Sequence, residues 1–459
     1  MSDDLPMGWV CTNFVEIAEN TPNALKAGPF GSALKKSFYV PSGYKIYGQE
    51  QVIKEDPFYG DYYIDEEKYN SLRSCSVKPK DILISLVGTI GKVLILPEGI
   101  SEGIINPRLV KLSLHKSLTL AEFIKAYLES PSVRDYFSKL SHGGTMDILN
   151  LTTLKSLPIL LPPLNEQRRI VDKLDRIGDR NRTARNELSH IPKLIVRYKQ
   201  AVLVAAFSGD LTADWRETNQ LQHLQIKNWK TTDLGDLIID SPKNGLYKPR
   251  SSYGSGTRIL RIDGFYNGEV TSWESLKRLE INEQERTDYA LEVNDLVINR
   301  VNSPEYVGKS AIVRYLPEPC VFESNIMRFK VNTAQILPEY CVHFLCSPIG
   351  LQQLRKNVKH AVNQSSINQT DVKAVRVNVP PLEEQKEIVR RVEKMFEKID
   401  MVEQEYQKAA KLCDRLEQAT LAKAFRGELV PQDPDGEPAS VLLEQVKSQR
   451  SKGKIKTKK

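Results

Sequence analysis

Two short stretches of the chain combine glycine with lysine in a way that could bind a nucleotide phosphate. They are Val307–Ser310, which reads VGKS, and the segment GTIGK that ends at Lys92. A phosphate-binding loop needs another glycine five residues before the glycine of the Gly-Lys pair. Ser303 and Leu86 occupy those two positions, so neither stretch has the required spacing.

Other polar groupings also lack the pattern that catalysis or metal binding needs. Three acids and a lysine, Asp61, Asp65, Glu66 and Lys68, have the residue types of a nuclease-like cluster. Its surroundings, YGDYYIDEEKYN, are typical of a solvated turn. Cys341, His343 and Cys346 lie within the apolar segment YCVHFLC, which predicts a buried helix in preference to a zinc site. The sole Asn-Pro pair is followed by Arg108 and does not form an amino-methylation tetrad. The sequence therefore predicts no catalytic residue and no metal site.

Two polar loops have the composition that contact with DNA requires. The first, KAGPFGSALKKSFYVPSGYK, carries Lys35 and Lys36 among glycines, prolines and aromatic residues. The second, SPKNGLYKPRSSYGSGTRILRI, carries cations together with asparagine, serine and tyrosine. Cations bind phosphates, whereas Asn, Ser and Arg can read base edges. A solvated surface loop would explain either stretch alone, but the two occupy equivalent places in two related segments.

An internal repeat organises the whole chain. PPLNEQRRIV begins at Pro162, and PPLEEQKEIV begins at Pro380, 218 positions later. At the same offset, QAVLVAAFSGDL from Gln200 aligns with QATLAKAFRGEL from Gln418, with seven of twelve residues identical. Two segments of equal length, 162–211 and 380–429, therefore share both their beginnings and their ends.

Both repeated segments carry a heptad pattern. Apolar residues recur in steps of four and three from Ile170 to Val202, and again from Ile388 onward. A 3.5-residue period sustained in this way predicts two long helices that pair as a coiled coil. Gly209 and Gly427 are expected to end the helices, and Pro192 to kink or break the first of them. Asn181, a polar residue in the seam, fits either a register device or a solvated interruption.

Composition places these helices in a chain of several domains. The protein has 459 residues, is 40% hydrophobic and has a net charge of +7. The tail from Lys447 to Lys459 holds seven Lys or Arg and no acid, which leaves 58 basic and 58 acidic residues elsewhere. We expect residues 430–459 to form a basic, disordered tail, either as a solubilising end or as a nonspecific DNA contact. Without a membrane-length apolar run or a signal pattern, a cytoplasmic location in a bacterial or archaeal cell is expected.

Taken together, these motifs resemble the specificity (S) subunit of type I restriction-modification enzymes, the HsdS family. The resemblance rests on PPLNEQ and PPLEEQ, on GPFGS at 28–32 and on NGLYKP at 244–249, and it covers almost the whole chain. It implies an α+β fold with two target recognition domains, residues 1–161 and 221–379, in a pseudo-twofold arrangement. Two antiparallel coiled-coil helices, 162–211 and 380–429, would separate the domains as spacers.

The resemblance also implies a function and a set of partners. The chain would be a non-catalytic subunit that binds an asymmetric bipartite target in double-stranded DNA, one half-site per domain with a fixed spacer. Two methylation (M) subunits that bind S-adenosylmethionine and two restriction (R) subunits that use ATP and Mg would carry out adenine methylation or cleavage. No cofactor is expected in this chain itself.

Specific residues follow from this assignment. The predicted DNA contacts are Lys35, Lys36, Asn244, Tyr247, Lys248, Arg250 and Arg261, followed by Thr145, Gln364 and Ser365. The predicted surface for the M subunits is Pro163, Leu164, Glu166 and Gln167 with Pro381, Leu382, Glu384 and Gln385. Packing at the start of a helix would explain the Pro-Pro-Leu and Glu-Gln positions equally well.

Three other interpretations of the sequence remain open at this point. A self-sufficient modification enzyme would need a catalytic motif that the chain does not display. A coiled-coil scaffold would have no role with nucleic acid. A specificity subunit of a related defence or methyltransferase system that lacks a restriction subunit would share every feature described above.

Overall fold

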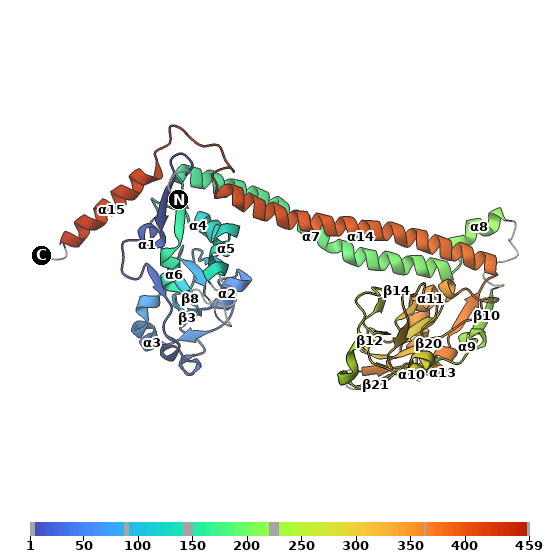
Figure 1. Cartoon of the computed structure of the whole chain (residues 1–459). Coiled ribbons are helices and arrows are strands. Elements are labelled where there is room, and N and C mark those ends of the chain that lie inside the picture. Colours follow the sequence, from blue (N-terminus) through green and yellow to red (C-terminus); the bar gives the residue numbers. More distant parts are fainter. Residues whose placement is uncertain (1–4, 87–90, 141–149, 220–228, 362–363, 457–459) are drawn as a thin grey trace. The chain divides into compact units, whose positions relative to one another are not determined.

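The computed structural model describes residues 5–86, 91–140, 150–219, 229–361 and 364–456. The chain divides into two compact units, Met1–Leu188 with Lys408–Lys459, and Ser189–Gln407. Each unit holds one globular domain of mixed helix and sheet and one half of a pair of long helices (Figure 1). The predicted α+β class is therefore confirmed.

The first domain is built from short strands and short helices. Its strands are β1 (Val10–Asn13), β2 (Leu25–Ala27), β3 (Tyr44–Tyr47), β4 (Tyr63–Ile64), β5 (Ile82–Ser85), β6 (Val93–Ile95), β7 (Gly103–Ile105), β8 (Leu109–Leu112) and β9 (Pro158–Leu161). Its helices are α1 (Phe14–Ile17), α2 (Gln49–Lys54), α3 (Glu66–Ser71), α4 (Ala121–Leu128), α5 (Pro131–Leu140) and α6 (Leu151–Ser156). The strands form sheets in the orders β2-β8-β5-β6, β4-β3-β7 and β1-β9.

The second domain follows a similar plan with more strands. Its strands are β10 (Lys230–Asp233), β11 (Lys243–Asn244), β12 (Tyr253–Leu260), β13 (Phe265–Tyr266), β14 (Gly268–Val270), β15 (Arg278–Leu279), β16 (Leu296–Asn299), β17 (Val301–Asn302), β18 (Ser310–Ile312), β19 (Cys320–Phe322), β20 (Ile326–Phe329), β21 (Lys359–Ala361), β22 (Gln364–Ser366) and β23 (Arg376–Val379). Its helices are α9 (Leu234–Leu237), α10 (Glu283–Asp288), α11 (Pro338–Cys346), α12 (Pro348–Leu354) and α13 (Gln369–Lys373). The sheets run β11-β20-β16-β18-β14-β13, β15-β12-β19, β17-β22-β21 and β10-β23.

The two domains share one topology. The order β2-β8-β5-β6 in the first matches β11-β20-β16-β18 in the second, and β1-β9 matches β10-β23. In the third pair of sheets, β3 and β12 are the middle strands, each antiparallel to one neighbour and parallel to the other. The central strands ILIS and LVIN are fully buried, as continuous apolar runs predict. The weak sequence relation between the domains therefore reflects a common fold.

The repeated segments form the long helices. Helix α7 spans Leu164–Phe207, and α14 spans Leu382–Ala424. Gly209 and Gly427, with φ values of 77° and 74°, end the helices in the left-handed conformation, as predicted. Helix α7 continues through Pro192, so the expected break does not occur. A short helix, α8 (Ala213–Thr218), follows α7.

Within each unit, the halves of α7 and α14 run antiparallel. In the first unit, Arg185 pairs with Asp414 at 2.9 Å; in the second, Lys199 pairs with Asp400 at 2.8 Å. Asn181 is buried and donates from Nδ2 to the carbonyl oxygen of Cys413 at 3.1 Å. A cross-helix hydrogen bond of this kind favours the register device over the solvated interruption.

Only part of the predicted seam is buried. In the second unit, Val202 and Leu203 join a core cluster with Ile388 and Val392. Tyr198 and Val402, also predicted for the seam, are exposed. The heptad positions therefore overestimate the packing, because two helices alone cannot enclose large side chains where no globular domain covers them.

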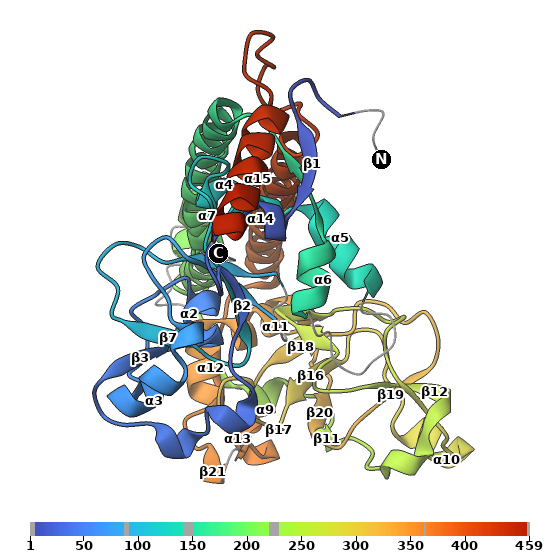
Figure 2. The same ribbon diagram turned by 90° about the vertical axis from the view of Figure 1, so that its left-hand side faces the viewer.

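The tail prediction is wrong for part of its length. Residues Ala439–Lys456 form helix α15, and the expected disorder is absent there. Leu443 and Val446 bury their side chains against Leu118 of the first domain, with Val10 packed alongside, and Figure 2 shows α15 next to β1. The high charge of the last residues concealed this apolar face. Within the described ranges, no helix is both long enough and apolar enough to cross a bilayer.

Candidate nucleic-acid interface

In both domains the polar loop begins at a glycine, Gly28 in the first and Gly245 in the second. We call the backbone around each of them a glycine turn, and the two turns occupy the same place in the fold. The backbone N–H of Gly28 donates to Leu109 at 2.9 Å, and that of Gly245 donates to Ile326 at 3.1 Å. Leu109 and Ile326 are the first residues of β8 and β20, which pair with the central strands β5 and β16. The two motifs GPFGS and NGLYKP are thus structurally equivalent, as their place in the sequence suggested.

These turns press directly against a neighbouring strand segment. A Cβ atom on Gly28 would overlap the backbone carbonyl of Asn106, and one on Gly245 would overlap the carbonyls of Phe322 and Glu323. Only glycine allows such a close approach of two backbones. The glycines therefore fix where each polar loop leaves the sheet.

In the first domain, the predicted contacts Lys35 and Lys36 are exposed beyond this turn. They lie at the start of a 3-10 turn at Lys36–Phe38. No carboxylate among the described residues pairs with either lysine, so both charges are available to a phosphate. The ring of Phe38 lies under the Nζ of Lys68, at 3.9 Å from its centroid, which holds the far end of the loop.

In the second domain, the predicted contacts form two kinds of group. Asn244, Tyr247 and Arg250 are exposed, and no carboxylate in the described part of the chain pairs with Arg250. Lys248 pairs with Glu285 at 2.7 Å, and Arg261 pairs with Glu323 at 3.2 Å. The cationic surface is therefore smaller than the count of basic residues suggests.

Glu323 is an organising residue that the sequence analysis did not identify. Glu323 is buried, and its carboxylate accepts a hydrogen bond from the backbone N–H of Ile262 at 2.6 Å. Its backbone forms a parallel β-bridge with Leu246 in the polar loop of the second domain. Arg261 also lies 5.7 Å from the ring centroid of Tyr253. Glu323 thus ties Arg261 to the Asn244–Arg250 loop. Its sequence context carries no signal for this role.

Lys309 is a second residue that the sequence analysis did not identify, and it contacts the same segment around Ile262. Its Nζ donates to the carbonyl of Ile262 at 2.7 Å and lies 3.6 Å from the ring centroid of Tyr266. Burial lowers the pKa of Lys309 to about 8. The lysine of the VGKS segment therefore stabilises the connection between β12 and β13, in which Ile262 lies.

The remaining predicted DNA contacts are less favourably placed. Ser365 is only 1% exposed, so the prediction that its side chain contacts DNA is wrong; β22 buries it beside β17. Gln364 is the first residue of β22. Thr145 lies outside the described residues.

The Glu of each repeated motif is enclosed by its own domain. Glu166 accepts from Trp9 Nε1 at 3.1 Å, and Glu384 accepts from Trp229 Nε1, also at 3.1 Å. Both carboxylates are at most 2% exposed. Burial raises the pKa of Glu166, and this effect outweighs the hydrogen bonds from Trp9 and Gln432, which favour the charged form. Glu384 additionally forms an ion pair with Arg216.

The Gln of each motif is bound in the same way in both domains. Gln167 accepts from the backbone N–H of Leu120 at 3.0 Å and donates to the carbonyl of Pro162, also at 3.0 Å. Gln385 accepts from Leu337 at 2.8 Å and donates to Pro380 at 2.9 Å. Both side chains are completely buried. Each glutamine therefore joins the start of a long helix to the loop before α4 or α11.

These contacts correct the predicted partner surface. Glu166, Gln167, Glu384 and Gln385 cannot contact another subunit directly, because their side chains are buried and hydrogen-bonded within the chain. Packing at the helix start, the alternative explanation, describes them. Pro163, Leu164 and Leu382 are half-buried, and Pro381 is exposed.

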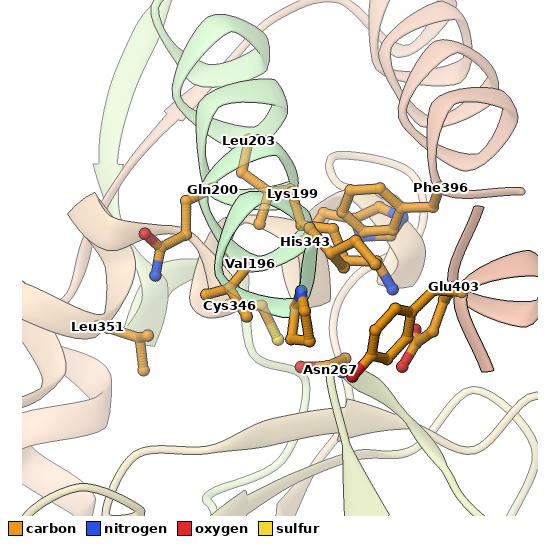
Figure 3. Close-up of a pocket in the computed structure, with 13 residues that line it drawn as sticks. Val196, Lys199, Gln200, Leu203, Asn267, His343, Cys346, Leu351, Phe396 and Glu403 are labelled. Atoms are coloured by element: carbon orange, nitrogen blue, oxygen red, sulfur yellow. The ribbon is translucent and has the colours of Figure 1, made fainter. Parts of the chain in front are cut away.

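The segment YCVHFLC forms the buried helix α11, as predicted. Burial and the nearby Arg314 lower the pKa of His343 to about 4, so the ring is neutral at pH 7, and its Nε2 has no hydrogen-bond partner in the part of the chain that the structure describes. His343, Phe396, Lys199 and Glu403 line a cavity of about 340 Å³. Figure 3 shows His343 beside Phe396 there. Among the described residues, no group of His, Cys, Asp and Glu has the geometry to hold a metal ion.

Comparison with known proteins agrees with this geometry. Residues 31–193 and 226–411 match the family model described as type I restriction modification DNA specificity domain. The EcoKI specificity subunit of Escherichia coli K12 is 33% identical over 346 residues, which is 73% of either chain. The StySPI specificity subunit of Salmonella potsdam is 32% identical over 338 residues, or 72% of either chain.

Solved structures show the same fold at lower identity. A chain from a study of complex assembly and conformational transition in the type I restriction-modification system superposes with a TM-score of 0.69 and 18% identity, covering 93% of this chain and 99% of that one. The HsdS subunit from Thermoanaerobacter tengcongensis gives a TM-score of 0.55, also with 18% identity, over 93% and 98% of the two chains. With two matched domains, two long helices and a family model that covers most of its length, the chain belongs to the family of type I restriction-modification specificity subunits.

Proposed function

We propose that this chain selects an asymmetric, bipartite DNA target, in which each globular domain reads one half-site. The observation that carries the proposal is the equivalent placement of two chemically different loops, Gly28–Lys36 and Asn244–Arg250, on one shared topology. Equal topology supports equal roles for the two domains. Different side chains at the same place support different base sequences in the two half-sites.

The long helices would fix the distance between the half-sites. The two ion pairs named above have the same register: α7 advances from Arg185 to Lys199 while α14 retreats from Asp414 to Asp400, 14 positions in both cases. Antiparallel helices of equal length favour a pseudo-twofold relation between the domains, as in dimeric readers of paired half-sites. A single spacer length in the target follows from one helix length.

The chemistry would be supplied by other subunits. We propose that two methylation subunits bind S-adenosylmethionine and methylate an adenine in each half-site, and that two restriction subunits use ATP and Mg for cleavage. The chain itself would contribute recognition alone, with no cofactor of its own. Partner subunits that close around the DNA would also provide phosphate contacts that the neutral body of this chain lacks.

The partner surface is better sought on the exposed apolar residues of the long helices than at the Glu-Gln positions. In the second unit, Leu194, Val196 and Met401 are all more than half exposed, and in the first unit Leu412 is 60% exposed. Exposed apolar groups of this kind favour association with another protein. Taken unit by unit, the helix starts can add to these surfaces: the half-buried Pro163 and Leu164 in the first unit, and the half-buried Leu382 with the exposed Pro381 in the second.

Sequencing that detects modified adenines in host DNA tests the proposal. The expected motif has two different specified halves separated by a fixed number of unspecified bases. A deletion of the gene that encodes this chain should abolish the modification. A palindromic motif, or a motif that survives the deletion, would overturn the assignment.

A further inference from the structure

Each glycine turn carries an aromatic ring two residues further on. Phe30 follows Gly28, and Tyr247 follows Gly245. Phe30 is 87% exposed and Tyr247 is 78% exposed, the two highest values for any large apolar side chain among the described residues, ahead of Ile239 at 62%. Aromatic side chains are usually buried in a fold, because they carry a large apolar area. Two such rings at equivalent positions therefore need an explanation.

The backbone around each ring is well determined by hydrogen bonds. In the first domain, the carbonyl of Phe30 accepts from the N–H of Ala33 at 2.8 Å. In the second, Leu246 donates to Phe322 at 2.8 Å and accepts from Ser324 at 2.9 Å. The tight packing of Gly28 and Gly245 holds the start of each turn. The exposure of the rings is thus set by the fold of the turn, and each ring is presented with a pre-organised backbone.

The charge around the rings indicates the kind of surface that covers them. Lys35 and Lys36 follow Phe30 within six positions, and Arg250 follows Tyr247 by three. None of these three cations pairs with a carboxylate within the described ranges of the chain. An exposed ring beside unpaired cations suits a nucleic acid, because phosphates bind the charges while the flat ring can stack on a base.

We propose that Phe30 and Tyr247 each enter a base step of their respective half-sites as a wedge, so that the ring stacks on the base that it separates from its neighbour. This inference rests on the proposed function and names the residues that deform the DNA. Phe30 has no hydrogen-bonding group, so its effect on sequence preference comes through the ease with which a base step opens. The neighbouring lysines and arginine hold the phosphates on either side.

The test uses the full chain assembled with its methylation subunits and a duplex that carries the mapped motif. Phe30→Ala and Tyr247→Ala are compared with Phe58→Ala and Tyr315→Ala, which remove rings that are each 59% exposed elsewhere in the same two domains. Dissociation constants are measured at several salt concentrations. The fluorescence of 2-aminopurine, placed in turn in each half-site, reports unstacking of the bases.

We expect Phe30→Ala and Tyr247→Ala each to weaken specific binding by about tenfold or more, as loss of base stacking does. The dependence of affinity on salt should stay unchanged, because no phosphate contact is lost. Each variant should lose the fluorescence signal in one half-site and retain it in the other. Phe30→Trp and Tyr247→Phe should bind as the unsubstituted chain does, since both keep a flat ring.

Two results separate the failure of this inference from the failure of the proposed function. If the unsubstituted complex binds its motif specifically while Phe30→Ala and Tyr247→Ala match their controls, the rings have no role in recognition and the inference is wrong. If the unsubstituted complex shows no preference for the motif, the proposed function fails, and the inference fails with it.

Discussion

The carboxylate of Glu384 offers a quantitative test of the corrected role of the Glu-Gln motifs. Its Oε1 accepts from Thr212 Oγ1 at 2.9 Å and pairs with Arg216, whose side chain is only 11% exposed. Its Oε2 accepts from Trp229 Nε1. Glu384→Ala would leave the guanidinium of Arg216 buried beside unpaired donors.

The expected cost follows from these contacts. Removal of one partner of a buried ion pair costs about 3–5 kcal/mol, which is a large fraction of the roughly 5–15 kcal/mol that stabilises a domain. Glu166→Ala is the matched control, because Glu166 has neutral partners, Trp9 and Gln432. Its loss should cost only about 1–3 kcal/mol.

Hydrogen-exchange mass spectrometry on the full chain can assign each loss to its own domain. Glu384→Ala should lower the opening free energy of the buried strand β16 and leave that of β5 unchanged, whereas Glu166→Ala should do the reverse with a smaller effect. Arg216→Met added to Glu384→Ala should recover part of the loss, because no unpaired charge remains. Equal effects of the two single variants, or no effect of Glu384→Ala on β16, would show that the ion pair between Glu384 and Arg216 does not stabilise the second domain.

Three other predictions follow from the described contacts. Replacing both Lys35 and Lys36 by Ala should reduce the slope of log affinity against log salt by up to about two, and an unchanged slope would exclude them as phosphate contacts. Because His343 has a pKa of about 4 when folded and 6.5 in the unfolded chain, its contribution to stability is present above pH 6.5 and lost as the pH falls toward 4. Protonation of His343 should therefore contribute roughly 2 kcal/mol to the loss of stability between pH 7 and pH 5, so the unsubstituted chain should lose that much more than His343→Gln, and parallel pH profiles of the two in urea unfolding would contradict this. Asn181→Leu should stabilise the helix pair by about 1 kcal/mol, because the buried Oδ1 of Asn181 has no hydrogen-bond partner among the residues described. A lower unfolding midpoint would show that the hydrogen bond from Asn181 to Cys413 outweighs that cost.

The long helices and the shared fold were accessible from the sequence because they depend on local patterns. The 218-residue offset fixed the ends of α7 and α14 to within five residues, and Gly209 and Gly427 stop them as their residue type predicts. The exposure of Tyr198 and Val402 was not predictable from the heptads. It depends on which parts of the helices a globular domain covers, and a periodic pattern does not contain that information.

The candidate site was predicted less well, for a related reason. Loop composition located Lys35 and Arg250 on the surface, yet it could not show that Lys248 and Arg261 are paired with Glu285 and Glu323, which lie far away in the sequence. The duplicated motif identified the Glu and Gln positions but did not indicate that their side chains are buried. Contacts between residues far apart in the sequence decide both which cations are paired and which side chains are buried.

If each domain reads its own half of a bipartite target, the two halves can be exchanged separately. A domain swap tests this: residues 229–379 are replaced by the corresponding domain of a related specificity subunit, and the modified motif is mapped in host DNA. We expect one half-site and the spacer length to be retained, while the other half-site changes to that of the donor. A motif in which both halves change, or in which neither changes, would contradict it.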